Sequence, residues 1–305
     1  MLIAIDHGNK QIKLGTSNRV FTSGLKESDT RPPFGDDILF YNDKFYTLSE
    51  NRIPYLRHKY EDERFYILTL FAIAFEIEDT GRYSPGVIPI RLLVGLPPAH
   101  LGAQYKDFEN YFKRGVVEFE FHGRSYKINI LNVTVYPQAF AAAMPVYDQI
   151  RSLPKVIIID IGGFTADYLL IKNGKADLSV CDTLEHGVII LYNKIIGRVN
   201  SELDILLDET DIDAILKHDH HEFNSRVVSI VNDMAQFFIS DLIGKLRERA
   251  IDLRTGKTVF VGGGSILLKE QIEDSGKITS ILFVDKIAAN AKGYELLYKA
   301  YITKR

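Results

Sequence analysis

Residues 160–167 read DIGGFTAD and follow the apolar run VIII at residues 156–159. This pattern predicts a buried strand that ends in a carboxylate and then turns on two glycines. Residues 2–15 read LIAIDHGNKQIKLG and repeat the same order, with an apolar run, an aspartate, a nearby glycine and a returning strand. Glycines in such turns let backbone N–H groups approach an anion, because no Cβ stands in the way.

The two aspartates indicate a divalent cation. Asp6 and Asp160 would repel a phosphate directly, so they favour an intervening Mg²⁺, which carboxylates hold directly or through its water shell. Lys13 follows on the first returning strand, from which its ammonium can reach phosphates as a point charge. A third glycine run, Gly262 to Gly264, follows another apolar run. An ordinary hairpin turn explains any one of these loops, whereas the three together favour a phosphate-binding site.

Other common motifs are excluded. Gly256-Lys257-Thr258 has the end of a P-loop, but Ile251 occupies the position of the first glycine and a strand is expected to follow. The glycines at 262–264 do not fit the dinucleotide-binding fingerprint, because Leu267 stands where its last glycine is needed. The run HDHH at residues 218–221 lacks the spacing of a helical metal site and is expected to be a solvated loop.

Strands and helices alternate along the chain, which predicts an α/β protein. Residues 138–144 (QAFAAAM) are expected to open a helix of small residues. Thr210 is expected to cap another helix, with Asp213 as its capping-box partner. The order strand, turn, strand, helix, strand, helix occurs twice, so we expect two related halves that meet near residues 151–154 with a cleft between them. Further helices are expected over residues 61–78, 105–113 and 224–251.

The composition is that of an ordinary soluble protein, with 46% hydrophobic and 25% charged residues and a formal net charge of −3. This charge argues against direct binding to nucleic acid or to an anionic membrane. The single cysteine, Cys181, excludes an internal disulfide. The longest strongly apolar helical stretch, residues 66–75, is about half of the ~20 residues that a membrane span needs. We therefore expect a cytoplasmic protein without a membrane segment.

These motifs resemble those of the actin, sugar kinase and heat-shock chaperone ATPase superfamily. Residues 6–15 are similar to its phosphate-1 motif, residues 160–165 to its phosphate-2 motif and residues 262–264 to its adenosine motif. YPQAFAAAM and DKIAANAKGYELL resemble its two connecting helices. DERFYILTLFAIAF, LLVGLPPAHL and ANAKGY resemble segments of the ParM/StbA-type bacterial actins, which segregate plasmids. His7 departs from the small or acidic residue expected beside the first aspartate.

The resemblance implies an actin-like (ribonuclease H-like) α/β fold in which two related domains flank a nucleotide cleft. Residues 1–152 with the closing helix 287–305 would form domain I, and residues 153–286 would form domain II. The implied cofactors are ATP, with GTP as the alternative, and Mg²⁺.

The resemblance also implies roles for individual residues. Asp6 and Asp160 would hold hydrated Mg²⁺. Gln138 would orient the attacking water, because a glutamine amide can position water without being a strong base. Glu185 is a candidate for a nucleoside contact, and the glycines at 262–264 would pack against the adenosine, where a side chain would collide. The implied phosphate- and adenosine-contacting residues are Gly8, Asn9, Lys13, Gly162, Gly163, Thr165, Gly262, Gly263 and Gly264.

The implied function is that of an ATPase which polymerises head to tail into filaments in a nucleotide-dependent way. In the segregation family the filament moves plasmids through a DNA-binding adaptor protein of the ParR type, which fits a mildly acidic chain that need not touch DNA itself. Two alternatives remain within the superfamily: a small-molecule kinase, and a nucleotide-gated scaffold for cell division or pilus assembly. No persuasive extra aspartate is present as the base that a kinase would need.

Overall fold

The computed structural model describes residues 1–219 and 222–303, and the chain divides into two compact units. Unit 1 comprises Met1–Pro145 and Ala288–Arg305, and unit 2 comprises Val146–Ile287. The first boundary falls earlier than expected because helix α3 (Tyr147–Ile150) belongs to unit 2, where Tyr147 Oη donates a hydrogen bond to the Gly174 carbonyl (3.0 Å). The histidines at 220 and 221, expected in a solvated loop, lie outside the described residues.

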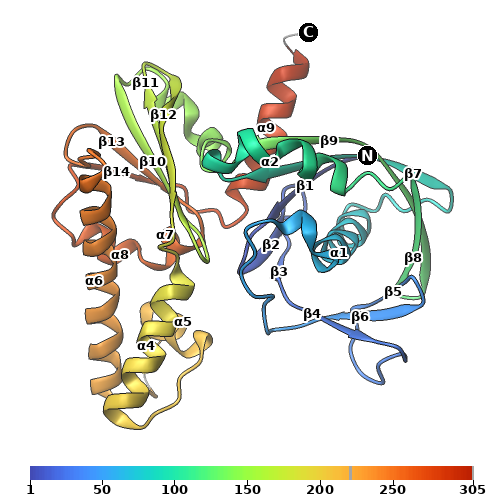
Figure 1. Cartoon of the computed structure of the whole chain (residues 1–305), viewed down its shortest axis with the longest axis horizontal. Coiled ribbons are helices and arrows are strands. Elements are labelled where there is room, and N and C mark those ends of the chain that lie inside the picture. Colours follow the sequence, from blue (N-terminus) through green and yellow to red (C-terminus); the bar gives the residue numbers. More distant parts are fainter. Residues whose placement is uncertain (220–221, 304–305) are drawn as a thin grey trace. The chain divides into compact units, whose positions relative to one another are not determined.

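Unit 1 is built on a nine-stranded sheet with the strand order β3-β2-β1-β7-β9-β8-β5-β6-β4. β1 and β7 pair in parallel, as do β7 and β9, and the other neighbours are antiparallel. The sheet curls around helix α1 (Figure 1). Its strands are β1 (Leu2–His7), β2 (Gln11–Leu14), β3 (Val20–Thr22), β4 (Leu25–Ser28), β5 (Ile38–Tyr41), β6 (Lys44–Leu48), β7 (Val87–Leu96), β8 (Val116–Phe121) and β9 (Arg124–Pro137).

Helix α1 (Glu63–Asp79) forms the centre of this curled sheet. Every residue from Phe65 to Ile77 is buried, as a largely apolar helix requires, and the one buried carboxylate, Glu76, accepts hydrogen bonds from Ser17. Its cap is Asp62, whose side chain accepts a hydrogen bond from the Arg64 amide (2.9 Å). The other helices of unit 1 are η1 (Lys59–Glu61), α2 (Pro98–Tyr111), η2 (Ala141–Val146) and α9 (Ala289–Thr303).

Alternation along β1 separates the two faces of the sheet. Ile3 and Ile5 pack into the core around α1, whereas Ala4 packs with residues of α9 on the other face. Successive side chains of a strand point to opposite faces, so the next two residues, Asp6 and His7, also diverge. Asp6 therefore shares the face of Ala4, and His7 shares the face of the core.

The segment QAFAAAM is not the α-helix that the sequence predicts. Ala139 has a φ of +60°, which interrupts any helix that would start at Gln138, and the following turn is the 3-10 helix η2. Pro145 lies inside η2 and has no N–H to donate, so the segment does not continue as an α-helix.

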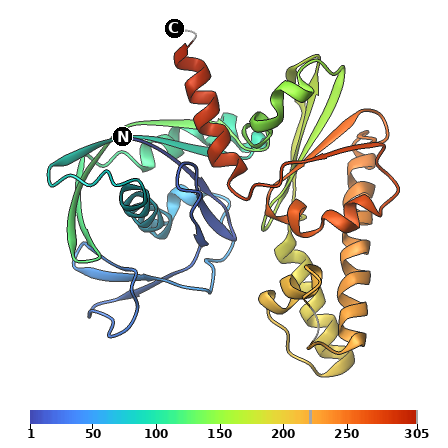
Figure 2. The ribbon, with the colours of Figure 1, turned by 180° about the vertical axis from the view of Figure 1, so that it is seen from behind.

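Unit 2 contains a five-stranded sheet with the order β12-β11-β10-β13-β14. One face of β10 carries Ile157, Ile159 and Ile161, which pack with α4 and α6 in a single core. Figure 2 shows the unit from behind, with the long helix α6 beside this sheet. Its elements are β10 (Lys155–Ile161), β11 (Ala166–Lys172), β12 (Lys175–Leu184), α4 (Val188–Leu203), α5 (Glu209–Leu216), α6 (Ser225–Glu248), β13 (Lys257–Val261), α7 (Gly263–Leu267), α8 (Lys269–Glu273) and β14 (Ser280–Phe283).

Helix α6 is long and apolar enough to cross a membrane by length and composition alone. This helix is the amphipathic one expected over residues 224–251. The helix is amphipathic, and core helices of soluble proteins meet the same criterion. Its buried side chains recur at helical spacing and join the core of unit 2: Val227, Ile230, Val231, Ala235, Phe238, Ile239, Leu242, Ile243 and Leu246.

Asp208, and not Thr210, caps helix α5. Asp208 Oδ1 accepts hydrogen bonds from the amides of Thr210 (2.7 Å) and Asp211 (2.9 Å). Asp211 Oδ2 accepts in return from the Asp208 amide (2.9 Å), which completes a capping box. The expected pair, Thr210 and Asp213, lies two residues too late. A carboxylate is also favoured at this position because it complements the positive end of the helix dipole.

This assignment predicts different effects for two neighbouring substitutions. Asp208→Ala should lower the free energy of unfolding by about 1 kcal/mol, because two amides lose their acceptor. Thr210→Ala is the matched control and should change it by less than about 0.5 kcal/mol. Urea unfolding followed by circular dichroism measures both, and a larger loss for Thr210→Ala would contradict the capping assignment.

Candidate functional site

Asp6, at the end of β1, is buried, and both of its carboxylate oxygens have partners. Lys13 Nζ donates to Oδ2 (3.2 Å), and Gln138 Nε2 donates to Oδ1 (2.9 Å). The antiparallel register of β1 and β2 sets Lys13 directly opposite Asp6. Gln138 follows β9, and its backbone N–H donates a hydrogen bond to the Leu96 carbonyl at the end of β7 (2.8 Å). Unit 1 thus brings together an acid, a cation and a carboxamide that the sequence analysis singled out.

The turn after Asp6 leaves no room for a side chain at Gly8. A Cβ on Gly8 would lie 2.6 Å from the Gln11 carbonyl oxygen and 2.9 Å from Lys13 Nζ. Asn9 follows, and its buried Oδ1 has no hydrogen-bond partner among the described residues. The side-chain-free backbone at Gly8 and the buried acceptor Asn9 Oδ1 lie next to each other. They fit a bound group that donates hydrogen bonds, such as the water shell of Mg²⁺. The residues of this turn therefore fit the expected ligand.

His7 points away from this turn and belongs to the core. Its Nε2 lies 2.8 Å from Thr69 Oγ1, and Thr69 gives its own hydroxyl proton to the Phe65 carbonyl (2.7 Å). His7 must therefore be the donor through Nε2, which leaves Nδ1 as a bare acceptor. The ring contacts Phe108 and Phe112 of the α2 segment. An aromatic ring at this position thus fills the core and takes no part in the turn.

The His7 ring is uncharged. Its burial, with a smaller effect of the Lys59 ammonium, lowers the pKa of His7 from 6.5 to about 3. Lys59, on η1, donates a hydrogen bond to the His7 carbonyl, so this second lysine also lies beside the turn. The sequence analysis missed Lys59, which carries no motif of its own.

In unit 2, Asp160 ends β10 on the sheet face opposite α4 and α6. Gly262 has a φ of +87°, and a Cβ there would lie 2.1 Å from Asp160 Oδ1. A Cβ on Gly264 would lie 2.7 Å from the Ile161 carbonyl oxygen, whereas one on Gly263 would meet no atom within 4 Å. The expected reason for these glycines was contact with adenosine. The structure adds a reason inside the protein, because Gly262 and Gly264 pack against the end of β10.

The loop from Gly162 to Thr165 is held by the start of α4. The Gly162 amide donates to the Thr165 carbonyl (2.8 Å) and closes the turn. The first amides of α4 then donate to the carbonyls of Phe164, Gly162 and Gly163, at 2.9, 3.1 and 2.8 Å. The first N–H groups of a helix have no acceptor within the helix, and here the loop carbonyls accept them. The start of α4 therefore positions the loop instead of binding an anion itself. Glu185 lies just before α4 and is exposed.

Asp167 lies directly opposite Asp160 in the register of β10 and β11. Thr183 Oγ1 donates to Asp167 Oδ1 (2.5 Å), and Thr165 Oγ1 lies 3.5 Å from its Oδ2. The register thus places two carboxyl groups side by side on one face of the sheet. In the described part of the chain no group of three or more His, Cys, Asp or Glu side chains could hold a metal. A bound Mg²⁺ would therefore keep most of its waters.

A buried histidine before α4 escaped the sequence analysis. His186 Nε2 donates to the Phe238 carbonyl (3.0 Å), and Lys245 Nζ lies 3.1 Å from Nδ1. Lys245 also pairs with Asp241 (2.8 Å). Burial lowers the pKa of His186, so the ring is a neutral link between the Glu185 loop and α6. In the sequence, the only local sign that His186 links this loop to α6 is its position directly before Gly187, the residue that caps α4.

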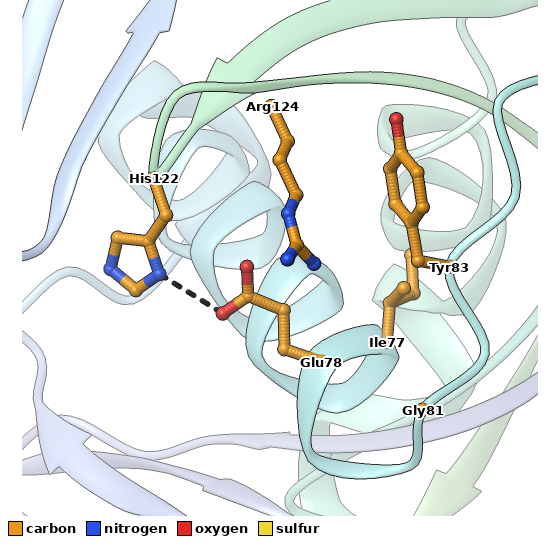
Figure 3. A pocket seen from close by; sticks show the side chains of 6 residues that line it. All are labelled: Ile77, Glu78, Gly81, Tyr83, His122 and Arg124. Atoms are coloured by element: carbon orange, nitrogen blue, oxygen red, sulfur yellow. Dashed lines mark hydrogen bonds and ion pairs between the residues drawn. The ribbon is translucent and has the colours of Figure 1, made fainter.

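A separate pocket of about 490 Å³ lies in unit 1, at the end of α1 and the β8–β9 turn (Figure 3). His122 bridges two carboxylates there, with Nδ1 3.0 Å from Glu78 Oε2 and Nε2 3.0 Å from Asp37 Oδ1. None of the residues expected in the nucleotide site lines this pocket. The lining residues are Ile77, Glu78, Gly81, Tyr83, His122 and Arg124.

The burial of His7 predicts a pH-dependent stability. The folded pKa is about 3 and the unfolded one about 6.5, so the unfolded chain binds the extra proton and stability falls as the pH drops below 6.5. His7→Phe removes this titration. Below about pH 6.5, the wild-type free energy of unfolding should fall by about 1.4 kcal/mol per pH unit more than that of the variant. His186 is present in both proteins and affects the pH dependence of both in the same direction. Equal slopes of the unfolding free energy against pH, measured by urea unfolding, would therefore contradict the burial of an uncharged His7.

Two family models match the chain. Residues 4–140 match the N-terminal domain of the actin-like proteins, and residues 158–274 match the C-terminal part of the archaeal actin homologue MreB-like family. No curated protein matches the sequence.

Solved structures match the fold over almost the whole chain. The archaeal actin homologue Ta0583 is 18% identical with a TM-score of 0.77, covering 98% of this chain and 99% of its own. A ParM filament subunit from Clostridium botulinum is 19% identical with a TM-score of 0.75, covering 98% and 99%. The actin-like protein Alp7A is 14% identical with a TM-score of 0.76, covering 100% and 98%. The resemblance to actin-like proteins of the ParM type that the sequence indicates is confirmed, and the chain has the actin-like fold of these solved structures.

Proposed function

We propose that this chain is an ATPase that assembles head to tail into filaments in a nucleotide-dependent way. The observation that carries the proposal is the Asp6 carboxylate, which is shared by Lys13 and Gln138 beside a turn that admits no side chain at Gly8. A structural hairpin needs neither a buried carboxylate nor a cation and an amide converging on it. A site for a metal–polyphosphate complex needs all of them.

The proposed metal ligands are Asp6 in unit 1 and Asp160 in unit 2, each acting through water. Mg²⁺, when bound, neutralises phosphate charge and so stabilises the transfer of the terminal phosphoryl group. Lys13 is placed by its ion pair with Asp6, which keeps its ammonium beside the Gly8 turn instead of in solvent. The backbone at Gly8, Gly162 and Gly163 would contact the phosphates.

Gln138 is the proposed water-orienting residue. A carboxylate oxygen only accepts hydrogen bonds, so the amide nitrogen of Gln138 must be the atom that faces Asp6. The other amide atom, Oε1, is then presented as an acceptor with a defined direction. An acceptor fixed in this way can hold a water for attack on a terminal phosphate without deprotonating it strongly.

Known proteins of the same fold support the nucleotide and the filament. Ta0583 has been crystallised in complex with ADP, and the Clostridium botulinum ParM and Alp12 have been seen as filaments. From these we propose ATP as the nucleotide, with GTP as the alternative, and a second copy of the chain as the main partner. We further propose a cytoplasmic role in plasmid segregation through a DNA-binding adaptor of the ParR type.

Light scattering with ATP and Mg²⁺ tests this function. Scattering should rise on mixing and fall as nucleotide is consumed, with phosphate release following the rise. Gln138→Ala should lower the rate of phosphate release by about a hundredfold, the scale that positioning contributes, and prolong the filaments. If scattering did not rise over a broad range of protein concentration, the proposed filament assembly would be rejected and the proposed ATPase activity would stand. Unchanged turnover in the variant would remove Gln138 from its role.

The metal role of Asp160 predicts a different loss. Asp160→Asn keeps the shape of the side chain and removes its charge, so nucleotide should bind equally weakly with and without Mg²⁺. The wild-type protein in EDTA is the matched reference and should bind as weakly as the variant. Titration of a fluorescent ATP analogue measures both. If Mg²⁺ tightened binding to the variant as much as to the wild type, Asp160 would not be a ligand.

A further inference from the structure

Ala139, directly after Gln138, has a left-handed backbone with a φ of +60°. This conformation is unfavourable for a residue with a Cβ and persists only where its surroundings impose it. Ala139 is fully buried, and its amide donates a hydrogen bond to Asn290 Oδ1 (3.1 Å). Asn290 lies on α9, far along the chain. A side chain of the last helix therefore holds the backbone beside the proposed water-orienting residue.

Helix α9 is shaped to come this close. A Cβ on Gly293, one turn after Asn290 on the same face of α9, would lie 1.8 Å from the Ala141 carbonyl oxygen. On β7, a Cβ on Gly95 would lie 2.0 Å from Oη of Tyr294, which is also on α9. The two glycines remove the side chains that would keep α9 away from β7 and from the turn. Asn290 can reach the Ala139 amide only because of this close approach.

The backbone bonds set the direction of the Gln138 side chain. The backbone N–H of Gln138 donates to the Leu96 carbonyl (2.8 Å), and the next backbone N–H, that of Ala139, donates to Asn290 Oδ1. Two successive N–H groups are thus tied to β7 on one side and to α9 on the other. With both tied, the Gln138 side chain emerges toward Asp6 and donates to Oδ1. These two bonds fix the peptide planes on either side of the Gln138 Cα, so loss of the Asn290 bond would let the second plane rotate and change the direction of the Gln138 side chain.

We propose that Asn290 is a positioning residue for catalysis. Its side-chain oxygen holds the peptide plane between Gln138 and Ala139, and this aims the side-chain amide of Gln138 at Asp6 and at the water that Gln138 orients. The role rests on the proposed ATPase function, in which Gln138 acts on that water. It makes turnover, and not nucleotide binding, depend on a residue of the closing helix.

Steady-state ATP hydrolysis, nucleotide affinity and thermal unfolding of three variants test the proposal. Asn290→Ala should lower kcat by about ten- to a hundredfold while the Kd for ATP with Mg²⁺ stays within about threefold, because displacing a catalytic group costs rate on this scale. Asn290→Asp keeps an acceptor oxygen in place and should restore much of kcat. Tyr298→Phe, on the same helix but bonded only to Arg91 among the described residues, is the control and should leave kcat unchanged.

A double-mutant cycle with Gln138→Ala separates positioning from a merely structural effect. If Asn290 acts through Gln138, Asn290→Ala should have no further effect on kcat once Gln138 is already alanine. Hydrogen exchange gives a second readout, since the Ala139 amide should exchange faster in Asn290→Ala but not in Tyr298→Phe.

The outcomes distinguish this role from the function on which it rests. Multiplicative losses in the double mutant, or an unchanged kcat in Asn290→Ala with an active wild type, would overturn the role of Asn290 alone. A wild-type chain that binds nucleotide but never hydrolyses it would remove the proposed ATPase and the positioning role together.

Discussion

A buried carboxylate is costly unless its oxygens are paired, and in unit 1 the carboxylate of Asp6 is the group on which the site depends. Its two oxygens tie together the end of β1, the facing residue of β2 and the turn after β9. Because strand residues alternate between faces, the same dipeptide that sends Asp6 to this face sends His7 into the core. One short segment therefore serves both the proposed site and the packing of the core.

Unit 2 builds the matching aspartate loop by a different physical means. Close packing shapes this loop, since Gly262 and Gly264 lie against Asp160 and Ile161 at distances that exclude any side chain at the two glycines. The amides at the start of α4 are used up by the carbonyls of the loop. The start of α4 and the glycine turn thus hold the loop and define the position of Asp160.

The closing helix α9 shows how a distant segment can act on such a site. Glycines on both sides of its contact surface allow an approach close enough for one side chain, Asn290, to bind the backbone at Ala139. An alanine in a left-handed conformation is a local conflict between sequence and backbone, and such conflicts concentrate where function requires a specific geometry. Here the conflict lies next to the residue that we propose orients water, and the backbone N–H at that position is bonded by a side chain from the other end of the chain.

Local patterns in the sequence were enough to predict an α/β protein with the two aspartate loops and most of the helices, because an apolar run followed by Asp-x-Gly is interpretable without distant contacts. The actin-like fold followed from the resemblance of these motifs to a known superfamily. They failed where two local solutions were equally good or where a distant residue decided. Asp208 and Thr210 are both acceptable caps, and only the hydrogen bonds of α5 select Asp208. The segment QAFAAAM has the small residues of an α-helix, yet Ala139 is left-handed and its backbone N–H is bound by Asn290 from 151 residues away instead of by a helix carbonyl. The burial of His7, the need for glycine at 262 and the direction of Gln138 likewise follow from tertiary packing, because each is imposed by atoms that only the folded chain brings within contact distance.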